Sequence, residues 1–235
     1  MMLDNLKICG ITSHDTARYC AGLGVGALGA VFFAKSPRNV SPQKARELFE
    51  GLPETTARVG VFVDRPTDEL LAIAREARLT TVQLHGSEPI ESVRAVLDAG
   101  YRVIRVLKVT GEALLAAARQ TPPEVGLLVE CGQDRLPGGN GATWNWSDAA
   151  PLAGLRPFAI AGGLGPQSIA QAAAESRAVA WDVSSGVESS PGVKDHAAIA
   201  RLAAALTHFQ RPLSTPVDPS RFWSPSVGPT RSFNL

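Results

Sequence analysis

Residues 158–195 read FAIAGGLGPQSIAQAAAESRAVAWDVSSGVESSPGVKD and hold two short apolar runs, each followed by small and polar residues. The runs are 158–161 and 180–183, and an alanine-rich stretch at 166–174 separates them. Runs this short and this apolar are typical of parallel strands buried on both faces, while the stretch between them has a helical pattern. The segment therefore predicts two consecutive strand–helix units of a parallel sheet.

The same alternation of apolar runs and amphipathic stretches extends over the rest of the chain and gives eight units in all. Ser41 before Pro42, and Thr67 before Asp68, are residue pairs that commonly begin helices. The remaining strands are expected at 6–9, 27–32, 58–62, 81–84, 102–107 and 126–129. The remaining helices are expected at 14–23, 42–51, 68–77, 90–99, 112–119, 147–153 and 195–209.

Eight strand–helix units in a chain of 235 residues predict the fold class. A closed (β/α)8 barrel, or TIM barrel, has eight such units in roughly 200–250 residues, whereas an open doubly wound sheet usually has fewer. We therefore expect an α/β protein with a single barrel domain over residues 1–210. The open sheet is the alternative.

Residues 211–235 differ in composition from the barrel segment, because five prolines interrupt them and no periodicity is visible. Proline-rich segments of this kind are usually unpacked, which favours an irregular, loosely packed C-terminal tail. The alternative is a tail whose adjacent aromatic residues, Phe222 and Trp223, anchor it to the barrel or to a second subunit.

Bulk composition limits the classes of function. The 23 basic and 22 acidic residues give a formal net charge of +1, which supplies no broad attraction for nucleic acid or an anionic membrane. Three scattered cysteines do not suit a disulfide framework or a zinc cluster, and the N-terminal sequence has no apolar signal region. We expect a cytoplasmic protein that acts on a small molecule, with no nucleic-acid or membrane partner.

The catalytic end of such a barrel is formed by the carboxyl ends of its strands, and several distinctive residues lie there. Cys9 ends the first strand, and Arg38 lies in the loop after the second. Cys9 is either an inert apolar residue or a thiolate favoured by a nearby Lys7 or Arg38. Arg38 is either a solvated loop residue or a bidentate ligand for a carboxylate.

Two further residues at this end, Glu130 and His85, also carry two interpretations each. Glu130 ends an otherwise apolar strand, where a carboxyl group acts either as a general acid with a raised pKa or as half of a salt bridge. His85 either binds a ligand or is a satisfied structural histidine. We expect Glu130 to be the acid and carry His85 as a candidate substrate-binding residue.

Glycine-rich turns after the last two strands predict a phosphate site. Gly162 and Gly163 let backbone N–H groups approach an anion, and a helix beginning at 166 adds its positive dipole end. Ser185 and Gly186 supply further donors on the neighbouring turn. A tight connection explains either turn alone, but turns paired on the last two strands of a barrel favour phosphate.

Seven motifs follow one another along most of the chain, from Lys7 to about Leu206. They are KICGIT at 7–12, FFAKSPRNVS at 32–41, VGVFV at 59–63, VQLHG at 82–86, PGGNGATWNW at 137–146, AIAGGL at 159–164 and DVSSGVESSPGVKD at 182–195. Together they resemble the phosphoribosylanthranilate isomerase family, and the combination of KICG, SPR, QLHG, DVSSGVE and PGVKD is highly specific.

The resemblance implies an Amadori rearrangement of N-(5-phosphoribosyl)anthranilate to a 1-deoxyribulose 5-phosphate derivative in tryptophan biosynthesis, with no metal or organic cofactor. It implies that Cys9 is the general base and that Arg38 binds the anthranilate carboxylate. It also implies that Asp182 orients Arg38 or the substrate amine. The glycine-rich turns correspond to the phosphate-binding loops of the family.

One position departs from the family, whose general acid is an aspartate where this chain has Glu130. Glutamate moves the carboxyl group by one methylene, and misplacement on that scale can cost roughly 10²-fold in rate. We expect Glu130 to be the acid, with Asp134 in the following loop as the alternative.

Two other functions and two assembly states are left open at this stage. One alternative function is a phosphate-ligand-binding barrel with weakened or altered isomerase activity, because of the change at Glu130. The other is a related histidine-pathway isomerase, which is disfavoured because such enzymes use an aspartate where this chain has Cys9. The sequence is compatible with either a monomer or a homodimer.

Overall fold

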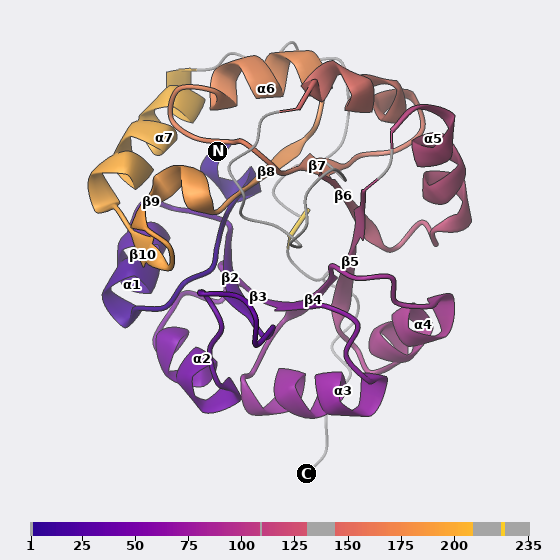
Figure 1. Ribbon diagram of the computed structural model, residues 1–235. Helices are drawn as coiled ribbons and strands as arrows, with labels where there is room; N and C mark the ends of the chain where they lie inside the picture. Colours follow the sequence, from indigo (N-terminus) through magenta and orange to yellow (C-terminus); the bar gives the residue numbers. More distant parts are fainter. Residues whose placement is uncertain (1, 109, 131–143, 209–221, 224–235) are drawn as a thin grey trace.

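The computed structural model describes residues 2–108, 110–130, 144–208 and 222–223. Strands β1 to β8 pair in parallel in chain order, and β8 pairs with β1, which closes the barrel. Figure 1 looks along the barrel axis and shows the helices as a ring around the strands. The predicted TIM barrel is confirmed. None of the described helices is long and apolar enough to cross a membrane.

The expected bounds of β1, β4, β5, β6 and β8 are confirmed to the residue, and the other strands differ from prediction only at their ends. The barrel strands are β1 (Leu6–Cys9), β2 (Ala27–Val31), β3 (Ala57–Phe62), β4 (Thr81–Leu84), β5 (Arg102–Leu107), β6 (Gly126–Val129), β7 (Ala159–Ile160) and β8 (Ala180–Val183). The α-helices are α1 (His14–Gly22), α2 (Pro42–Leu48), α3 (Thr67–Glu76), α4 (Ile90–Asp98), α5 (Gly111–Gln120), α6 (Ile169–Ser176) and α7 (His196–His208).

Local capping explains where some helices begin. Ser41 caps α2 as predicted, because its side chain accepts a hydrogen bond from the backbone N–H of Lys44 at 3.1 Å. Thr67 does not cap α3; it is the first residue of that helix, and Pro66 precedes it without a side-chain hydrogen bond. A proline before the first turn already has the fixed φ that suits a helix entry.

Two predicted helices are wrong in type or in starting point. The segment expected as a helix at 147–153 is a 3-10 helix, η2 (Trp146–Gly154), with Pro151 inside it. Proline lacks the N–H that a regular α-helix needs in its interior, which accounts for the tighter form. Helix α6 begins at Ile169 and not at 166, because the chain first makes a turn in which Ile169 donates to the Gly165 carbonyl at 2.9 Å.

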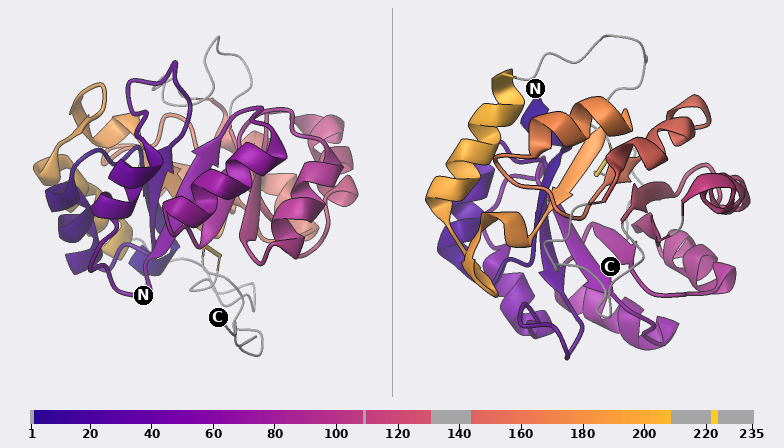
Figure 2. Two further views of the ribbon diagram at one scale, coloured as in Figure 1. Left: turned by 90° about the horizontal axis from the view of Figure 1, so that it is seen from below. Right: turned by 45° about the horizontal axis from the view of Figure 1, so that its top comes forward.

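Short elements at the two ends of the chain were not predicted. The 3-10 helix η1 (Met2–Asn5) precedes β1, and η3 (Ser185–Val187) follows β8. An antiparallel pair, β9 (Glu188–Ser190) and β10 (Val193–Lys194), then leads to α7. This pair lies beside the catalytic end of the barrel (Figure 2). Its residues Glu188 and Lys194 belong to the site described below.

Residues of β1 alternate between the two sides of the barrel wall. Leu6 and Ile8 join the apolar layer between the strands and the helices. Because side chains of a strand alternate, Lys7 and Cys9 lie on the other side and point into the barrel. Cys9 packs there in a small apolar cluster with Val31 of β2 and Val61 of β3. The first strand therefore supplies two chemically active side chains to the interior.

The floor of the barrel, where the strands begin, is lined by small residues. Strands β2, β3, β4, β6, β7 and β8 begin with Ala, Thr or Gly. Phe222 and Trp223 pack into the apolar cluster at this level, with 6% and 1% of their surfaces exposed. The yellow segment 222–223 accordingly lies near the barrel axis in Figure 1.

The packing of Phe222 and Trp223 corrects the sequence-based expectation for the tail. A loosely packed tail was favoured, but these two residues are docked in the barrel, as the alternative held. The signal was weak because one aromatic pair in a proline-rich segment has no periodicity. The rest of 211–235 lies outside the described residues.

Candidate active site

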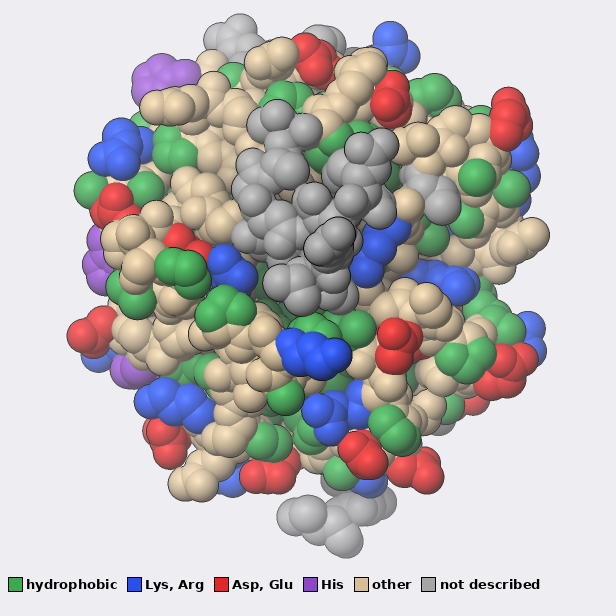
Figure 3. Space-filling view, in the orientation of Figure 1, with side chains coloured by type: hydrophobic (Ala, Val, Ile, Leu, Met, Phe, Trp, Pro, Cys, Tyr) green, Lys and Arg blue, Asp and Glu red, His purple; other side chains and the backbone are tan. Residues whose placement is uncertain are grey.

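The candidate catalytic side chains come from β1 and β8, from the residues directly after β4 and β6, and from the loops that follow β2 and β8. All of them lie at the barrel end where the strands finish, the end that faces the viewer in Figure 1. Figure 3 shows this face, on which several Lys and Arg side chains surround the central region. Basic groups around the mouth of a barrel suit a ligand that carries negative charge.

Lys7 and Asp182 form a buried ion pair beneath Cys9. The two residues lie opposite each other on β1 and β8, and Nζ of Lys7 donates to Oδ2 of Asp182 at 2.7 Å. Lys7 has no exposed surface and Asp182 has 7%. Burial lowers the pKa of Lys7, but its interactions with Asp182 and with Cys9 more than offset burial and leave it raised. Lys7 is therefore a buried cation.

Cys9 is a buried thiol whose ionisation depends on its charged neighbours. Burial raises the pKa of Cys9, and the carboxylate of Asp182 adds to this. The cations Lys7 and Lys194 act in the opposite direction, without cancelling the rise. In the ligand-free protein at neutral pH, Cys9 therefore holds its proton.

Glu130 is hydrogen-bonded to His85, and both side chains are buried. Nε2 of His85 donates to Oε2 of Glu130 at 2.7 Å, while Nδ1 of His85 accepts from the side-chain amide of Gln83 at 3.2 Å. Lys108, directly after β5, donates to the backbone carbonyl of His85 at 2.6 Å. The histidine is thus held on both ring nitrogens and faces the carboxyl group.

The pKa of Glu130 differs from the sequence-based expectation of a raised value. Burial raises it, but the hydrogen bond and charge of His85, together with Lys108 and Lys7, more than offset burial and leave it lowered. The expectation of a raised pKa is therefore wrong for the ligand-free protein. The reason is a partner 45 residues away in the chain, which the sequence does not identify.

Arg38 is part of a second buried charge cluster. Its Nε and Nη2 atoms donate to the two carboxylate oxygens of Glu188, at 2.8 and 2.6 Å. Lys194 donates to Oε1 of Glu188 at 2.7 Å, so two cations share one carboxylate. Burial raises the pKa of Glu188, but its hydrogen bonds to Arg38 and Lys194 outweigh burial and lower it. The site therefore has one more positive than negative charge here.

The structure corrects one of the two roles expected for Asp182, which were to orient Arg38 or to orient the substrate amine. Asp182 pairs with Lys7, and Glu188 orients Arg38 instead. The role of Asp182 toward the substrate amine stays a prediction. The second oxygen of Asp182, Oδ1, is buried and has no hydrogen-bond partner within the described part of the chain. A polar atom of that kind is available to a ligand.

The turns after β7 and β8 approach each other closely, as a shared anion site requires. Gly162 and Gly163 have φ values of +86° and +69°, a conformation that L side chains rarely adopt. A side chain at Gly186 would collide with the backbone carbonyl of Leu164, so only glycine fits there. Ser185 begins η3 on the same turn. Whether these groups bind phosphate stays a prediction.

Several site residues were not singled out from the sequence. Gln83 lies two residues before His85, and on a strand that spacing brings both to one face. Lys108 directly follows β5, the end at which a barrel presents its functional groups. Glu188 and Lys194 were visible within the DVSSGVESSPGVKD motif, but the contact of Glu188 with Arg38 spans 150 residues and needed the structure. Asp134, the alternative acid, lies outside the described residues.

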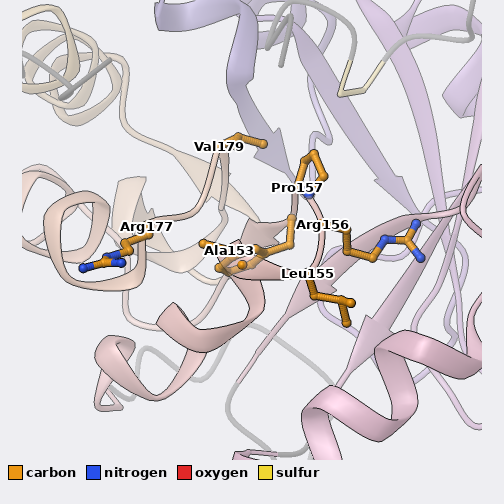
Figure 4. Close-up of a pocket in the computed structure, with 8 residues that line it drawn as sticks. Ala153, Leu155, Arg156, Pro157, Arg177 and Val179 are labelled. Atoms are coloured by element: carbon orange, nitrogen blue, oxygen red, sulfur yellow. The ribbon is translucent and has the colours of Figure 1, made fainter. Parts of the chain in front are cut away.

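A cavity of about 190 Å³ lies away from this site, at the other end of the barrel wall (Figure 4). It is lined by the end of η2, by Phe158 and Val179 just before β7 and β8, and by Arg177 after α6. Its walls are largely apolar side chains and backbone. It contains none of the candidate catalytic residues, so it has no place in the chemistry considered below.

The fold and the groups at its catalytic end define the class of the protein: a (β/α)8-barrel enzyme with a buried thiol, paired carboxylates and buried lysines. The model of the family described as N-(5'phosphoribosyl)anthranilate (PRA) isomerase matches residues 6–205. The chain therefore belongs to the N-(5'-phosphoribosyl)anthranilate isomerase family.

Individual relatives agree with this assignment. The chain is 40% identical over 190 residues to the N-(5'-phosphoribosyl)anthranilate isomerase of Desulfatibacillum aliphaticivorans, a match that covers 81% of this chain and 87% of the relative. The solved phosphoribosyl anthranilate isomerase of Thermus thermophilus superposes with a TM-score of 0.80 at 37% identity, over 88% of this chain and all of that one. Another solved relative, with a TM-score of 0.76, 35% identity and coverage of 86% and 98%, is complexed with reduced 1-(o-carboxyphenylamino)-1-deoxyribulose 5-phosphate.

Proposed function

We propose that this protein catalyses the Amadori rearrangement of N-(5'-phosphoribosyl)anthranilate to 1-(2-carboxyphenylamino)-1-deoxyribulose 5-phosphate, a step of tryptophan biosynthesis. Family membership supports this, as does the solved relative that holds the reduced form of that product. The observation that carries the proposal is that Cys9 ends β1 and Glu130 directly follows β6, so that a buried thiol and a buried carboxyl group lie at the catalytic end of one barrel.

The first step that we assign is ring opening, with Glu130 as the acid. Its proton passes to the furanose ring oxygen, the bond from that oxygen to C1′ breaks, and the lone pair of the amine nitrogen forms a C1′=N iminium. His85 stabilises the carboxylate that is left behind, because it already donates to Oε2. Stabilising the conjugate base in this way favours release of the proton.

The second step is removal of the C2′ proton, with the Cys9 thiolate as the base. The electrons of the C2′–H bond form a C1′=C2′ double bond and neutralise the nitrogen, which gives an enolamine. Tautomerisation then moves a proton from the 2′ hydroxyl oxygen to C1′ and leaves the ketone. Lys7, beside Cys9, favours the thiolate that this step needs. The net reaction is an isomerisation.

Binding of the two anionic ends of the substrate is assigned to the remaining site residues. We assign the anthranilate carboxylate to Arg38, whose orientation Glu188 already determines. We assign the phosphate to the turns containing Gly162, Gly163, Ser185 and Gly186, where glycine backbone leaves room for an anion. One chain holds all of these residues, so the proposal requires no second subunit.

Turnover of phosphoribosylanthranilate, followed by the loss of anthranilate fluorescence, tests the proposal directly. The wild-type protein should turn over and should also support growth of a tryptophan auxotroph that lacks this isomerase. Cys9→Ala should remove both properties. Binding of the reduced product analogue without turnover at any pH would instead favour a ligand-binding barrel with no isomerase function.

The assignment of the acid is tested by two matched substitutions that each remove one carboxyl group. Glu130→Gln should lower turnover by roughly 10²–10⁴-fold, because a positioned general acid contributes on that scale. Asp134→Asn should leave turnover near the wild-type value. The opposite result, with Asp134→Asn inactive and Glu130→Gln active, would move the acid to the loop after β6.

A further inference from the structure

The aromatic pair Phe222–Trp223 lies beyond the part of the chain that the family shares, because the family model ends at residue 205. The match to the Thermus thermophilus structure likewise takes in all of that chain but 88% of this one. Yet both side chains are buried inside the barrel. Two residues from outside the part matched by the family model therefore contribute to the interior of the barrel.

Three hydrogen bonds hold the pair in the floor of the barrel. The indole N–H of Trp223 donates to the backbone carbonyl of Asn5 at 2.9 Å. The carbonyl of Trp223 accepts from the hydroxyl of Thr81 at 2.9 Å, and the carbonyl of Phe222 accepts from Nε of Arg102 at 2.6 Å. The two rings also meet edge to face at 4.8 Å. Contacts to residues that begin β4 and β5, and to one just before β1, give Trp223 a defined position.

The ring of Trp223 faces the buried cation of the active site. Nζ of Lys7 lies 5.9 Å from its centre, within the range of a cation–π interaction. The same Nζ forms the ion pair with Asp182 at 2.7 Å. Lys7 has no exposed surface, so these two contacts and its hydrogen bond with the Cys9 thiol replace water around its charge. Phe222 makes the corresponding contact with Arg102, at 5.8 Å, and not with Lys7.

We propose that Trp223 is a positioning residue for the active-site cysteine, and that it acts by holding Lys7 as a cation beneath Cys9. The proposal rests on Cys9 having the role assigned above. Lys7 and Cys9 are alternate residues of β1 and point to the same side. Lys7 is therefore the single residue that connects Trp223 with the thiol. Asp182, Lys194 and Arg38 also face the thiol, and none of them touches Trp223 in the described residues.

The test compares Trp223→Phe, which keeps an aromatic face toward Lys7, with Trp223→Leu, which keeps apolar volume but has no such face. The readout is the rate at which iodoacetamide alkylates the full-length protein at Cys9, measured against pH by mass spectrometry of the Cys9 peptide. This rate follows the thiolate and does not require isomerase activity. The alkylation experiment therefore tests the role of Trp223 even if the protein does not isomerise phosphoribosylanthranilate.

The apparent pKa of the Cys9 thiol should be about 0.3–0.5 pH unit higher in Trp223→Leu than in Trp223→Phe, because without the aromatic face the ammonium group of Lys7 is held less firmly beside the thiol. The alkaline limb of kcat/KM should move by the same amount. Phe222→Leu is the matched control, since it disturbs the same floor without touching Lys7. It should lower Tm and leave the thiol titration unchanged.

A second measurement covers the case in which Trp223→Leu does not fold. Uniform 5-fluorotryptophan weakens the aromatic face of Trp223 without changing its shape, and it should raise the thiol pKa of the wild-type protein. In Trp223→Phe, which keeps the other three tryptophans, the same labelling should have no effect. Equal thiol titrations in the Phe and Leu variants, or an equal response to fluorination with and without Trp223, would overturn the proposal.

Discussion

The two ends of the barrel interior are stabilised in different ways. At the catalytic end, Arg38–Glu188–Lys194 and Glu130–His85 bury charged or polar groups against one another. At the floor, the apolar side chains of Phe222 and Trp223 pack against the small residues that begin the strands. Buried charge pairs add little net stability but give polar groups a defined geometry, whereas buried aromatic surface contributes directly to folding. Catalytic positioning and fold stability are thus largely separated along one axis, and the contact between Lys7 and Trp223 is where the two ends meet.

The largest effect should come from the catalytic end. Cys9→Ala should reduce kcat/KM by about 10³–10⁴-fold, because it removes the proposed base from the reaction. The unfolding midpoint should stay within a few degrees of wild type, since the change deletes a single sulfur atom beside Val31 and Val61. Steady-state kinetics and calorimetry on the same preparation measure both. A large drop in Tm with little loss of rate would mean that Cys9 serves fold stability and not catalysis.

The floor should show the reverse pattern. Trp223→Ala should lower the free energy of unfolding by about 3–5 kcal/mol, because it leaves a cavity among buried residues. Its effect on kcat should be small beside that of Cys9→Ala. Urea unfolding of the full chain gives the free energy. A change below about 1 kcal/mol would show that the indole contributes little to the floor.

A third prediction concerns the pH profile, which sharpens the comparison within the catalytic end. The working form carries a proton on Glu130 and none on Cys9, whereas the pKa shifts of the ligand-free protein favour the reverse. The concentration of the working form is then constant at pH values between the two pKa values. It decreases when the pH is below the pKa of Glu130 and when the pH is above the pKa of Cys9. The acid limb of kcat/KM therefore reports the pKa of Glu130.

His85→Asn should therefore move the acid limb of kcat/KM to higher pH, because it removes the main groups that lower the pKa of Glu130. Gln83→Leu, which touches only the far nitrogen of the histidine, is the control and should move the limb less. An acid limb that stays in place in His85→Asn would show that Glu130 does not define it.

The smallest expected effect is a change in the acid stability of the fold. The folded-state pKa of Glu188 lies below its ordinary value of 4.5, so its contribution is present above that pH and is lost as the pH falls further. Glu188→Gln should flatten the decline of Tm between about pH 5 and pH 3. Its Tm at neutral pH should be lower than wild type, since Arg38 and Lys194 lose their shared counter-charge. An unchanged slope would assign acid sensitivity to other carboxyl groups.

The barrel was predictable from the sequence because each strand is a compact apolar run with a clear start and end. Strands such as β4 and β6 need only local information: residue type and length. The 3-10 form of η2 was missed because helical periodicity outweighed the single Pro151, although proline is the residue that excludes a regular helix interior. The late start of α6 was missed because the turn at 166–168 is itself helix-like.

The positions of the site residues were predictable, but their partners were not. Strand ends identified Cys9 and Glu130, since a barrel presents its functional groups there. The groups that control them are distant in sequence: Lys7 pairs with a carboxylate 175 residues away, and Arg38 with one 150 residues away. Such pairings follow from closure of the barrel and from the β9–β10 hairpin. The lowered pKa of Glu130 could not be anticipated for the same reason.

The docked aromatic pair also has a consequence for biosynthesis. The indole N–H of Trp223 donates to the carbonyl of Asn5, directly before β1. One of the first segments to be synthesised therefore packs against one of the last. Translation adds about 5–20 residues per second, so roughly ten seconds or more separate the two. All eight strands are therefore synthesised before the residues that fill the floor of the barrel, and the innermost packing is completed only after residue 223 has been synthesised.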